Sequence, residues 1–175
     1  MEKQIEREEI YKGKVIHVVK DKVVLDDNTI AIREVVIHNG GVCIALKDKE
    51  YFYMVKQYRY SEGKEMLEFP AGKIEKGEDP DEAIKRESME ETGYSAKNIK
   101  KFGYIIPTCG YSSEKIHLYY GEVDEYVGQH FDVDERMTLE KYTFQQIKEM
   151  IRNGEIDDAK TIALVCKLEL EGINA

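Results

Sequence analysis

The sequence predicts an α/β fold, in which helices cover a mixed sheet to form a sandwich, plus a small N-terminal antiparallel sheet. β-branched and aromatic runs separated by turn residues recur through the first 70 residues and again between residues 101 and 123. Helical patterns with capping residues begin near residues 79, 143 and 157. At 175 residues and 42% hydrophobic, the chain is long enough for one domain with a real core.

The first forty residues predict a strand hairpin. Residues 14–38 carry two β-branched runs around the turn residues Asp26, Asp27 and Asn28. After a second turn at residues 39–41, GVCIAL and YFYMVKQYRY form a more hydrophobic hairpin. The change of character near residue 40 is the only candidate boundary. We therefore expect an N-terminal β-hairpin region over residues 1–40 and the main domain over residues 41–175.

A helix is predicted between Asp79 and Gly93. Asp79 suits the N-cap, Pro80 suits the first helical position, and Glu82 would complete a capping box. Gly93 supplies the stop signal.

The remaining elements follow the same signals. A short strand is expected over residues 65–69, two strands lie in KFGYIIPTCG and KIHLYYGEV, and another lies around residues 139–142. Thr143 with Gln146 predicts a capping box for a helix that ends at Gly154, and Asp157 is expected to open the last helix.

Charge and cysteine content exclude several classes of protein. A formal charge of -9 argues against a nucleic-acid or anionic-membrane surface, because phosphate groups attract clustered Lys and Arg. Three scattered cysteines suggest neither a disulfide framework nor a zinc site. The charged N-terminus lacks an apolar leader, and no apolar run approaches membrane length. We expect a cytoplasmic protein.

Three carboxylates gather on the first helix. Glu87, Glu90 and Glu91 are three and four residues apart, so they share one helical face. Because like charges at this spacing repel, the cluster predicts a divalent cation bound among the three carboxylates. The alternative is a solvated acidic helix face.

The surrounding residues decide between these two interpretations. Gly72, Glu78, Arg86, Glu87, Glu90, Glu91 and Gly93 match the pattern G-x5-E-x7-R-E-U-x-E-E-x-G-U, where U is usually apolar. This is the Nudix box, and the chain resembles the Nudix hydrolases. Ser88 departs from the pattern at the first U position, which removes no ligand.

The resemblance implies a metal centre and the Nudix-type α/β/α sandwich. Glu87 and Glu91 would be the first ligands, Glu90 a shared ligand or a support to metal-bound water, and Ala71 would contribute a backbone carbonyl. The expected cofactor is Mg²⁺, with Mn²⁺ as an alternative, because two or three protein carboxylates suffice for magnesium. Arg86 is expected to pair with Glu78 and hold the loop against the helix.

Further stretches resemble the ADP-ribose pyrophosphatase branch of the family. They are Pro107, the following TCGYSSEKIHLYY, VKQYRY before the box, EFPAGKIE at it, and IREVVIHNGGVCIAL in the N-terminal region. The resemblance implies hydrolysis of ADP-ribose to AMP and ribose 5-phosphate. It also implies a homodimer in which the N-terminal sheet of one subunit completes the substrate pocket of the other.

The substrate-binding residues expected from this branch are Arg33, Arg59, Glu114 and Tyr11. Arginine suits the diphosphate because its planar fork binds phosphate oxygens in pairs. Each arginine could instead make a surface or dimer salt bridge. Tyr11 would stack on adenine, although a tyrosine in this chain is more often a packing residue.

The general base is expected on the acidic loop that contains Asp132, Asp134 and Glu135. Glu135 aligns best, and Glu90 is the second candidate. Val133 and Thr138 stand where relatives carry further acids, so a solvated acidic turn is the alternative for this loop. Two other functions stay open: hydrolysis of another nucleoside diphosphate derivative such as a sugar nucleotide, and non-catalytic sensing of ADP-ribose.

Overall fold

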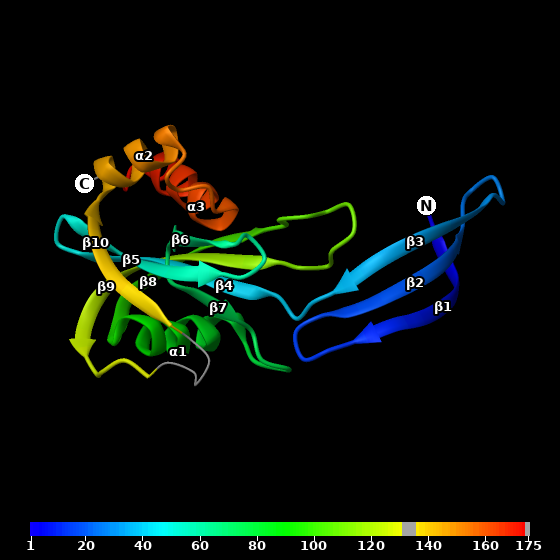
Figure 1. Cartoon of the computed structure of the whole chain (residues 1–175), viewed down its shortest axis with the longest axis horizontal. Helices are drawn as coiled ribbons and strands as arrows, with labels where there is room; N and C mark the ends of the chain where they lie inside the picture. Colours follow the sequence, from blue (N-terminus) through cyan, green and yellow to red (C-terminus); the bar gives the residue numbers. More distant parts are fainter. Residues whose placement is uncertain (131–135, 174–175) are drawn as a thin grey trace. The chain divides into compact units, whose positions relative to one another are not determined.

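The computed structural model describes residues 1–130 and 136–173 (Figure 1). These residues separate into two compact units. The first comprises residues 1–40 together with residues 106–115, and the second comprises residues 41–105 together with the described residues from 116 onward.

The first unit is built on a three-stranded antiparallel sheet in the order β1-β2-β3. Its strands are β1 (Lys3–Lys12), β2 (His17–Val24) and β3 (Ile30–Ile37). The predicted hairpin is β2–β3, and its turn is closed where Asn28 takes a φ of 65°, a conformation that asparagine tolerates better than most residues. The small N-terminal antiparallel sheet is therefore confirmed.

Strand β1 is not predicted by the sequence pattern. All ten of its residues are exposed, so no alternation of buried and exposed residues marks it. Its backbone pairs with β2, and Arg7 makes a two-pronged ion pair with Asp21, at 2.7 Å for each hydrogen bond. Non-local ion pairs of this kind leave no periodic signal in the sequence.

Residues 106–115 join the first unit through backbone hydrogen bonds to β3. The Val36 N–H donates to the Tyr111 carbonyl at 2.7 Å, and the Ser113 N–H donates to the Val36 carbonyl at 2.9 Å. The unit is therefore assembled from two stretches that are far apart in the sequence.

The second unit contains a seven-stranded mixed sheet in the order β10-β5-β4-β9-β8, with β6 paired to β5 and β7 paired to β4. Strand β4 runs parallel to β9, and its other neighbours are antiparallel. The strands are β4 (Gly41–Asp48), β5 (Tyr51–Arg59), β6 (Lys64–Glu68), β7 (Ala71–Lys73), β8 (Tyr94–Ile105), β9 (Ile116–Tyr126) and β10 (Met137–Thr143).

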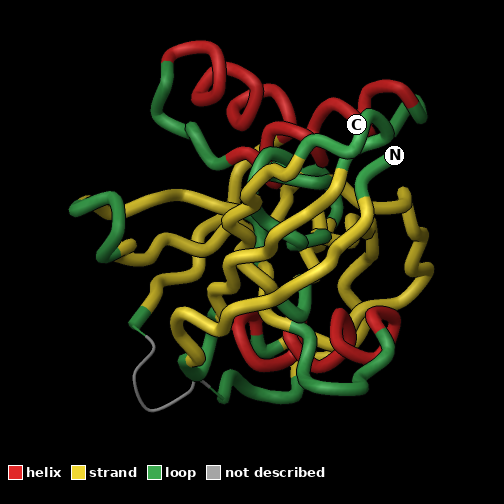
Figure 2. Tube along the Cα trace, turned by 90° about the vertical axis from the view of Figure 1, so that its right-hand side faces the viewer, coloured by secondary structure: helices red, strands yellow, loops and turns green. Residues whose placement is uncertain are grey.

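Helices cover both faces of this sheet (Figures 1 and 2). Helix α1 (Pro80–Thr92) lies on one face, and α2 (Phe144–Asn153) and α3 (Ala159–Leu170) lie on the other. Strand β4 is buried on both faces: Val42 and Ile44 pack in the core with α1, whereas Cys43 and Ala45 pack in the core with α2 and α3. The predicted α/β/α sandwich is confirmed.

Most helix ends follow the predicted caps. Asp79 caps α1 by accepting from the Asp81 N–H, Gly93 ends α1 with a φ of 76°, and Thr143 forms the predicted capping box of α2. Two details were predicted wrongly. The Glu82 carboxylate accepts from Lys85 instead of closing a capping box. Helix α3 is capped by Asp158 and not by Asp157, which forms an ion pair with Lys64.

Candidate active site

Helix α1 presents the three predicted carboxylates on one side, at three depths. Glu91 is buried, with 3% of the residue exposed. The Glu87 side chain is 12% exposed and that of Glu90 is 39% exposed. A ligand arriving from solvent would therefore meet Glu90 first and Glu91 last.

Gly72 makes room for the Glu87 carboxylate. A Cβ atom at residue 72 would lie 1.8 Å from Glu87 Cδ and 2.1 Å from both carboxylate oxygens. No side chain larger than hydrogen fits there unless Glu87 moves. The glycine of the motif is thus explained by close approach of a carboxylate to the backbone of β7.

Ala71 and Glu91 are joined directly. The Ala71 N–H donates to Glu91 Oε2 at 2.9 Å, so the predicted backbone ligand and the most buried carboxylate belong to one hydrogen-bonded pair. The preceding residue is fixed as well, because the Ile44 N–H donates to the Pro70 carbonyl at 2.9 Å. Strand β7 carries both Ala71 and Gly72 and pairs with the start of β4.

Arg86 uses every guanidinium donor within this cluster. Its Nε and Nη2 donate to the two Glu78 oxygens at 2.9 and 3.0 Å, and Nη2 also donates to the Lys73 carbonyl. Its Nη1 donates to Glu87 and to Glu90, each at 2.8 Å. The predicted Arg86–Glu78 pair is confirmed. The pair holds the pKa of Glu78 below its usual value and raises that of Arg86.

The C-terminal turn of α1 is tied to the residues that follow β9. The Gln129 side chain donates to the Glu91 carbonyl at 2.7 Å, and the His130 N–H donates to the Glu90 carbonyl at 3.1 Å. Residues 129 and 130 are thus bound to the main chain of the last turn of α1. Glu135, the predicted base, lies outside the described residues.

Arg59 lies in the second unit and is bound to Glu68. Its Nε and Nη2 donate to the two carboxylate oxygens at 2.7 and 2.6 Å, and Glu68 is only 1% exposed. The pKa of Arg59 is raised by this pair and, to a smaller extent, by the charge of Glu91. The Arg59 guanidinium is thus held in place by a buried carboxylate.

The other predicted substrate residues belong to the first unit. Arg33 makes a two-pronged pair with Glu2, with hydrogen bonds of 3.0 and 2.6 Å. A Glu114 carboxylate oxygen lies 3.6 Å from Nδ1 of His38. Tyr11 is 55% exposed on β1. The structure brings the predicted metal ligands together, and it places these three residues in the other unit.

The model of the NUDIX domain matches residues 37–165, which is most of the chain. The chain belongs to the Nudix family. A curated relative, an ADP-ribose pyrophosphatase of Bacillus subtilis (strain 168), is 34% identical over 173 residues, covering 97% of this chain and 94% of that protein. Another, a methanol dehydrogenase activator of Bacillus methanolicus, is 36% identical with the same coverage.

The Nudix fold is also seen in a solved relative. The crystal structure of an ADP compounds hydrolase superposes with a TM-score of 0.86, covering 98% of this chain and 95% of the other at 16% identity. At that identity the likeness concerns the fold. The predicted family and the predicted enzyme class, a Nudix pyrophosphatase, are confirmed by these relatives.

The Nudix box residues suit a divalent metal, on which hydrolases of this family generally depend. All candidate donors are oxygens, which hard cations such as Mg²⁺ prefer. Glu87 and Glu90 already share one cationic nitrogen, that of Arg86, so their carboxylates converge on a common positive charge. Within residues 1–130 and 136–173 no group of three acidic, His or Cys side chains surrounds one point, so a metal requires the carboxylates to turn toward it.

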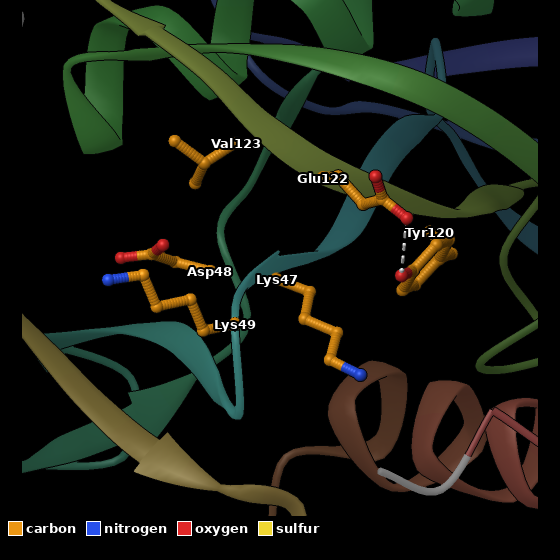
Figure 3. Close-up of a pocket in the computed structure, with 6 residues that line it drawn as sticks. All are labelled: Lys47, Asp48, Lys49, Tyr120, Glu122 and Val123. Carbon is orange, nitrogen blue, oxygen red and sulfur yellow. Dashed lines mark hydrogen bonds between the residues drawn. The ribbon is translucent and has the colours of Figure 1, made fainter.

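A separate cavity of about 300 Å³ lies at the far end of β4 in the Nudix fold (Figure 3). It is lined by Lys47, Asp48, Lys49, Tyr120, Glu122 and Val123. Strand β7, which carries the first glycine of the Nudix box, pairs with the first residues of β4, Gly41–Cys43, whereas the cavity lies at the last ones. None of the predicted site residues lines this cavity.

Sequence reasoning missed the polar residues behind the Nudix box. Glu68 and Thr161 are buried, and Lys160 binds Glu68 while Thr161 binds the neighbouring Phe69, in each case across 92 positions of the sequence. The one available signal was an acidic residue at the end of a short apolar strand, in MLEFP. Such a carboxylate is seldom buried without a cationic partner, which had to come from elsewhere in the chain.

Proposed function

We propose that the protein hydrolyses ADP-ribose to AMP and ribose 5-phosphate in a metal-dependent reaction. The observation that carries this proposal is the contact of two Nudix box carboxylates with β7: Gly72 leaves room for Glu87, and the Ala71 N–H donates to Glu91. The relative named ADP-ribose pyrophosphatase supports the substrate.

The proposed metal is Mg²⁺, with Mn²⁺ as a substitute, held by Glu87, Glu91 and the Ala71 carbonyl. When bound, such a cation neutralises diphosphate oxygens and lowers the pKa of a coordinated water. The proposed base is Glu90, which would accept a proton from the attacking water; its side chain is the most exposed of the three carboxylates. Glu135 is the second proposed base. Water adds its oxygen to one phosphorus, the bridging P–O bond breaks, and the protons leave with the two phosphate products.

The proposed substrate contacts are Arg59, Arg33, Glu114 and Tyr11. Arg59 is held by Glu68, three residues before Ala71, which supports a role at the diphosphate. The other three lie in the first unit. Their participation therefore depends on how the two units and a second subunit assemble.

We also propose a homodimer in which residues 1–40 act as the dimerisation element. Every residue of β1 is exposed, and large apolar side chains on this sheet face solvent, namely Ile5, Ile10, Tyr11, Ile30 and Ile32. Exposed apolar surface of this kind is typical of interfaces. Sedimentation analysis of the wild type and of Ile32→Glu tests the dimer, which the variant should weaken. A monomeric wild type at micromolar concentration would contradict it.

The proposed compartment is the cytoplasm. The cysteines Cys109 and Cys166 are free and exposed, which suits a reducing environment. No helix within residues 1–130 and 136–173 is long and apolar enough to cross a membrane.

Product analysis tests the proposed reaction. The purified protein is incubated with ADP-ribose, GDP-mannose, UDP-glucose and nucleoside triphosphates, in Mg²⁺ and in chelator. We expect AMP and ribose 5-phosphate chiefly from ADP-ribose, and only with metal. Cleavage of another diphosphate in preference to ADP-ribose would overturn the substrate while leaving the chemistry in place.

A second candidate function is regulation of another protein, which the relative named methanol dehydrogenase activator favours. In this role the protein would bind ADP-ribose as a sensor without hydrolysing it. Tight ADP-ribose binding with no product over hours in Mg²⁺ would favour the sensor over the hydrolase.

A further inference from the structure

A buried hydrogen-bond chain connects the N-terminus of α3 to the segment before the Nudix box. The Phe69 N–H donates to Thr161 Oγ1 at 2.9 Å, and the Thr161 hydroxyl donates to Asp158 Oδ2 at 2.6 Å. Phe69 and Thr161 are both fully buried. Since Asp158 is also the N-cap of α3, the helix cap and the segment are one hydrogen-bonded unit.

Lys160 adds an ionic link between the same two elements. Its ammonium binds Asp158 at 2.9 Å and also Oε2 of Glu68, the same oxygen that accepts from Nη2 of Arg59. The Lys160 side chain is 11% exposed and that of Glu68 is 2% exposed. Burial opposes the charged form of Lys160, but the two carboxylates outweigh it, so its pKa stays above the usual value.

Each residue from Glu68 to Ala71 is therefore bonded to another element of the second unit, and three elements share the four residues. Glu68 is held through its side chain and Phe69 through its N–H, both by α3. Pro70 is held through its carbonyl by β4, and Ala71 binds Glu91 of α1. The Glu68–Ala71 segment is bonded to α3 at one end and to Glu91 of α1 at the other. A shift of the end at α3 would therefore move the end that binds Glu91.

We propose that Thr161 and Lys160 are positioning residues of the metal site, which fix the Ala71 backbone and through it Glu91. The inference rests on the proposed metal centre. A helix cap alone does not require this arrangement, because Asp158 caps α3 by accepting from the Thr161 N–H at 2.9 Å. The Thr161 hydroxyl oxygen accepts in addition from the Phe69 N–H, which lies outside the helix.

Helix α2 offers a matched control. Thr143 caps it through a bond from the Gln146 N–H to Thr143 Oγ1 at 3.3 Å, and the Gln146 side chain accepts in return from the Thr143 N–H. Thr143→Val and Thr161→Val both remove a hydroxyl at a helix start, but only the second leaves the Phe69 N–H without its acceptor. Thr161→Ser keeps the hydroxyl.

The first test measures Mn²⁺ binding by electron paramagnetic resonance, with melting temperatures recorded for each variant. We expect the wild type to bind Mn²⁺ and Glu91→Gln to abolish this binding. Thr161→Val should bind roughly tenfold more weakly, which is the low end of the range for residues that orient metal ligands. Thr143→Val and Thr161→Ser should bind nearly as well as wild type. Equal binding by Thr161→Val and wild type would overturn the inference. Absence of Mn²⁺ binding by the wild type would instead overturn the proposed metal centre.

The second test uses the unaltered protein, so it stands even where Thr161→Val does not fold. Coupling between two sites is reciprocal. If the hydrogen bond between Phe69 and Thr161 strengthens metal binding, bound metal must stabilise that hydrogen bond. Saturating Mg²⁺ should slow hydrogen exchange at the Phe69 amide more than at the Gln146 amide. Equal changes at both amides would contradict the inference.

Discussion

Replacing Gly72 with alanine should separate metal binding from folding. The added Cβ would lie 1.8 Å from Glu87 Cδ, whereas ordinary contact begins at 3.4 Å, so the carboxylate must shift by 3.4 − 1.8 = 1.6 Å. A displacement of about 1 Å in a catalytic group can cost about 100-fold in rate. We therefore expect the kcat/KM of Gly72→Ala to fall at least about 100-fold, with a matching loss of Mn²⁺ affinity.

The same substitution should leave the fold intact. Gly72 lies in β7 without a left-handed φ, and alanine in a strand is more favourable than glycine by about 0.5–1 kcal/mol. The free energy of unfolding, measured by urea titration without metal, should therefore stay within about 1 kcal/mol of wild type.

A double-mutant cycle provides the control for this variant. In a Glu87→Ala background no carboxylate remains to be displaced, so Gly72→Ala should cause little further loss of Mn²⁺ affinity. Wild-type rate and affinity in Gly72→Ala would refute the reasoning. Equal losses in both backgrounds would show that the alanine acts through something other than Glu87.

Two further predictions concern stability. Burial would raise the pKa of Glu68, but Arg59 and Lys160 outweigh it and hold that pKa below 4.5. The ion pairs of Glu68 therefore stabilise the fold above pH 4.5, and this contribution is lost as the pH falls through the pKa of the folded state. Glu68→Gln should cost about 3–5 kcal/mol at pH 7 by urea titration, with the gap narrowing toward pH 3, and a gap independent of pH would contradict this. Gly93→Ala should lower the melting temperature more than Gly154→Ala does. Both glycines have a left-handed φ near 77°, so the backbone cost is the same. A Cβ at Gly93 would lie 2.7 Å from the Tyr126 ring, whereas one at Gly154 would meet open space. Equal losses would show that the φ angle alone decides the cost.

Local signals in the sequence predicted the elements that carry the site. Helix α1 follows from Asp79, Pro80 and Gly93, whose capping chemistry depends only on neighbours within a few residues. The buried strand β4 follows from its continuous apolar run. The pairing of Arg86 with Glu78 follows from the Nudix box.

Features that depend on distant residues could not be predicted in this way. Strand β1 is an exposed edge strand held by pairing with β2, so it carries no pattern of burial. The association of residues 106–115 with β3 and the link from Lys160 to Glu68 both join residues that are tens of positions apart. The cap of α3 was misplaced by one residue because Asp157 and Asp158 are chemically equivalent in the sequence.

The central claim is that the carboxylates of α1 bind the metal that hydrolysis requires. Its most direct test compares Mn²⁺ binding and AMP release from ADP-ribose in wild type, Glu91→Gln and Glu82→Gln. Glu82 lies on the same helix, but its carboxylate binds Lys85 and lies outside the cluster. We predict that Glu91→Gln lowers both quantities by at least about 100-fold, the upper end of the effect of residues that only orient ligands, while Glu82→Gln matches wild type. Unchanged hydrolysis in Glu91→Gln would contradict the account.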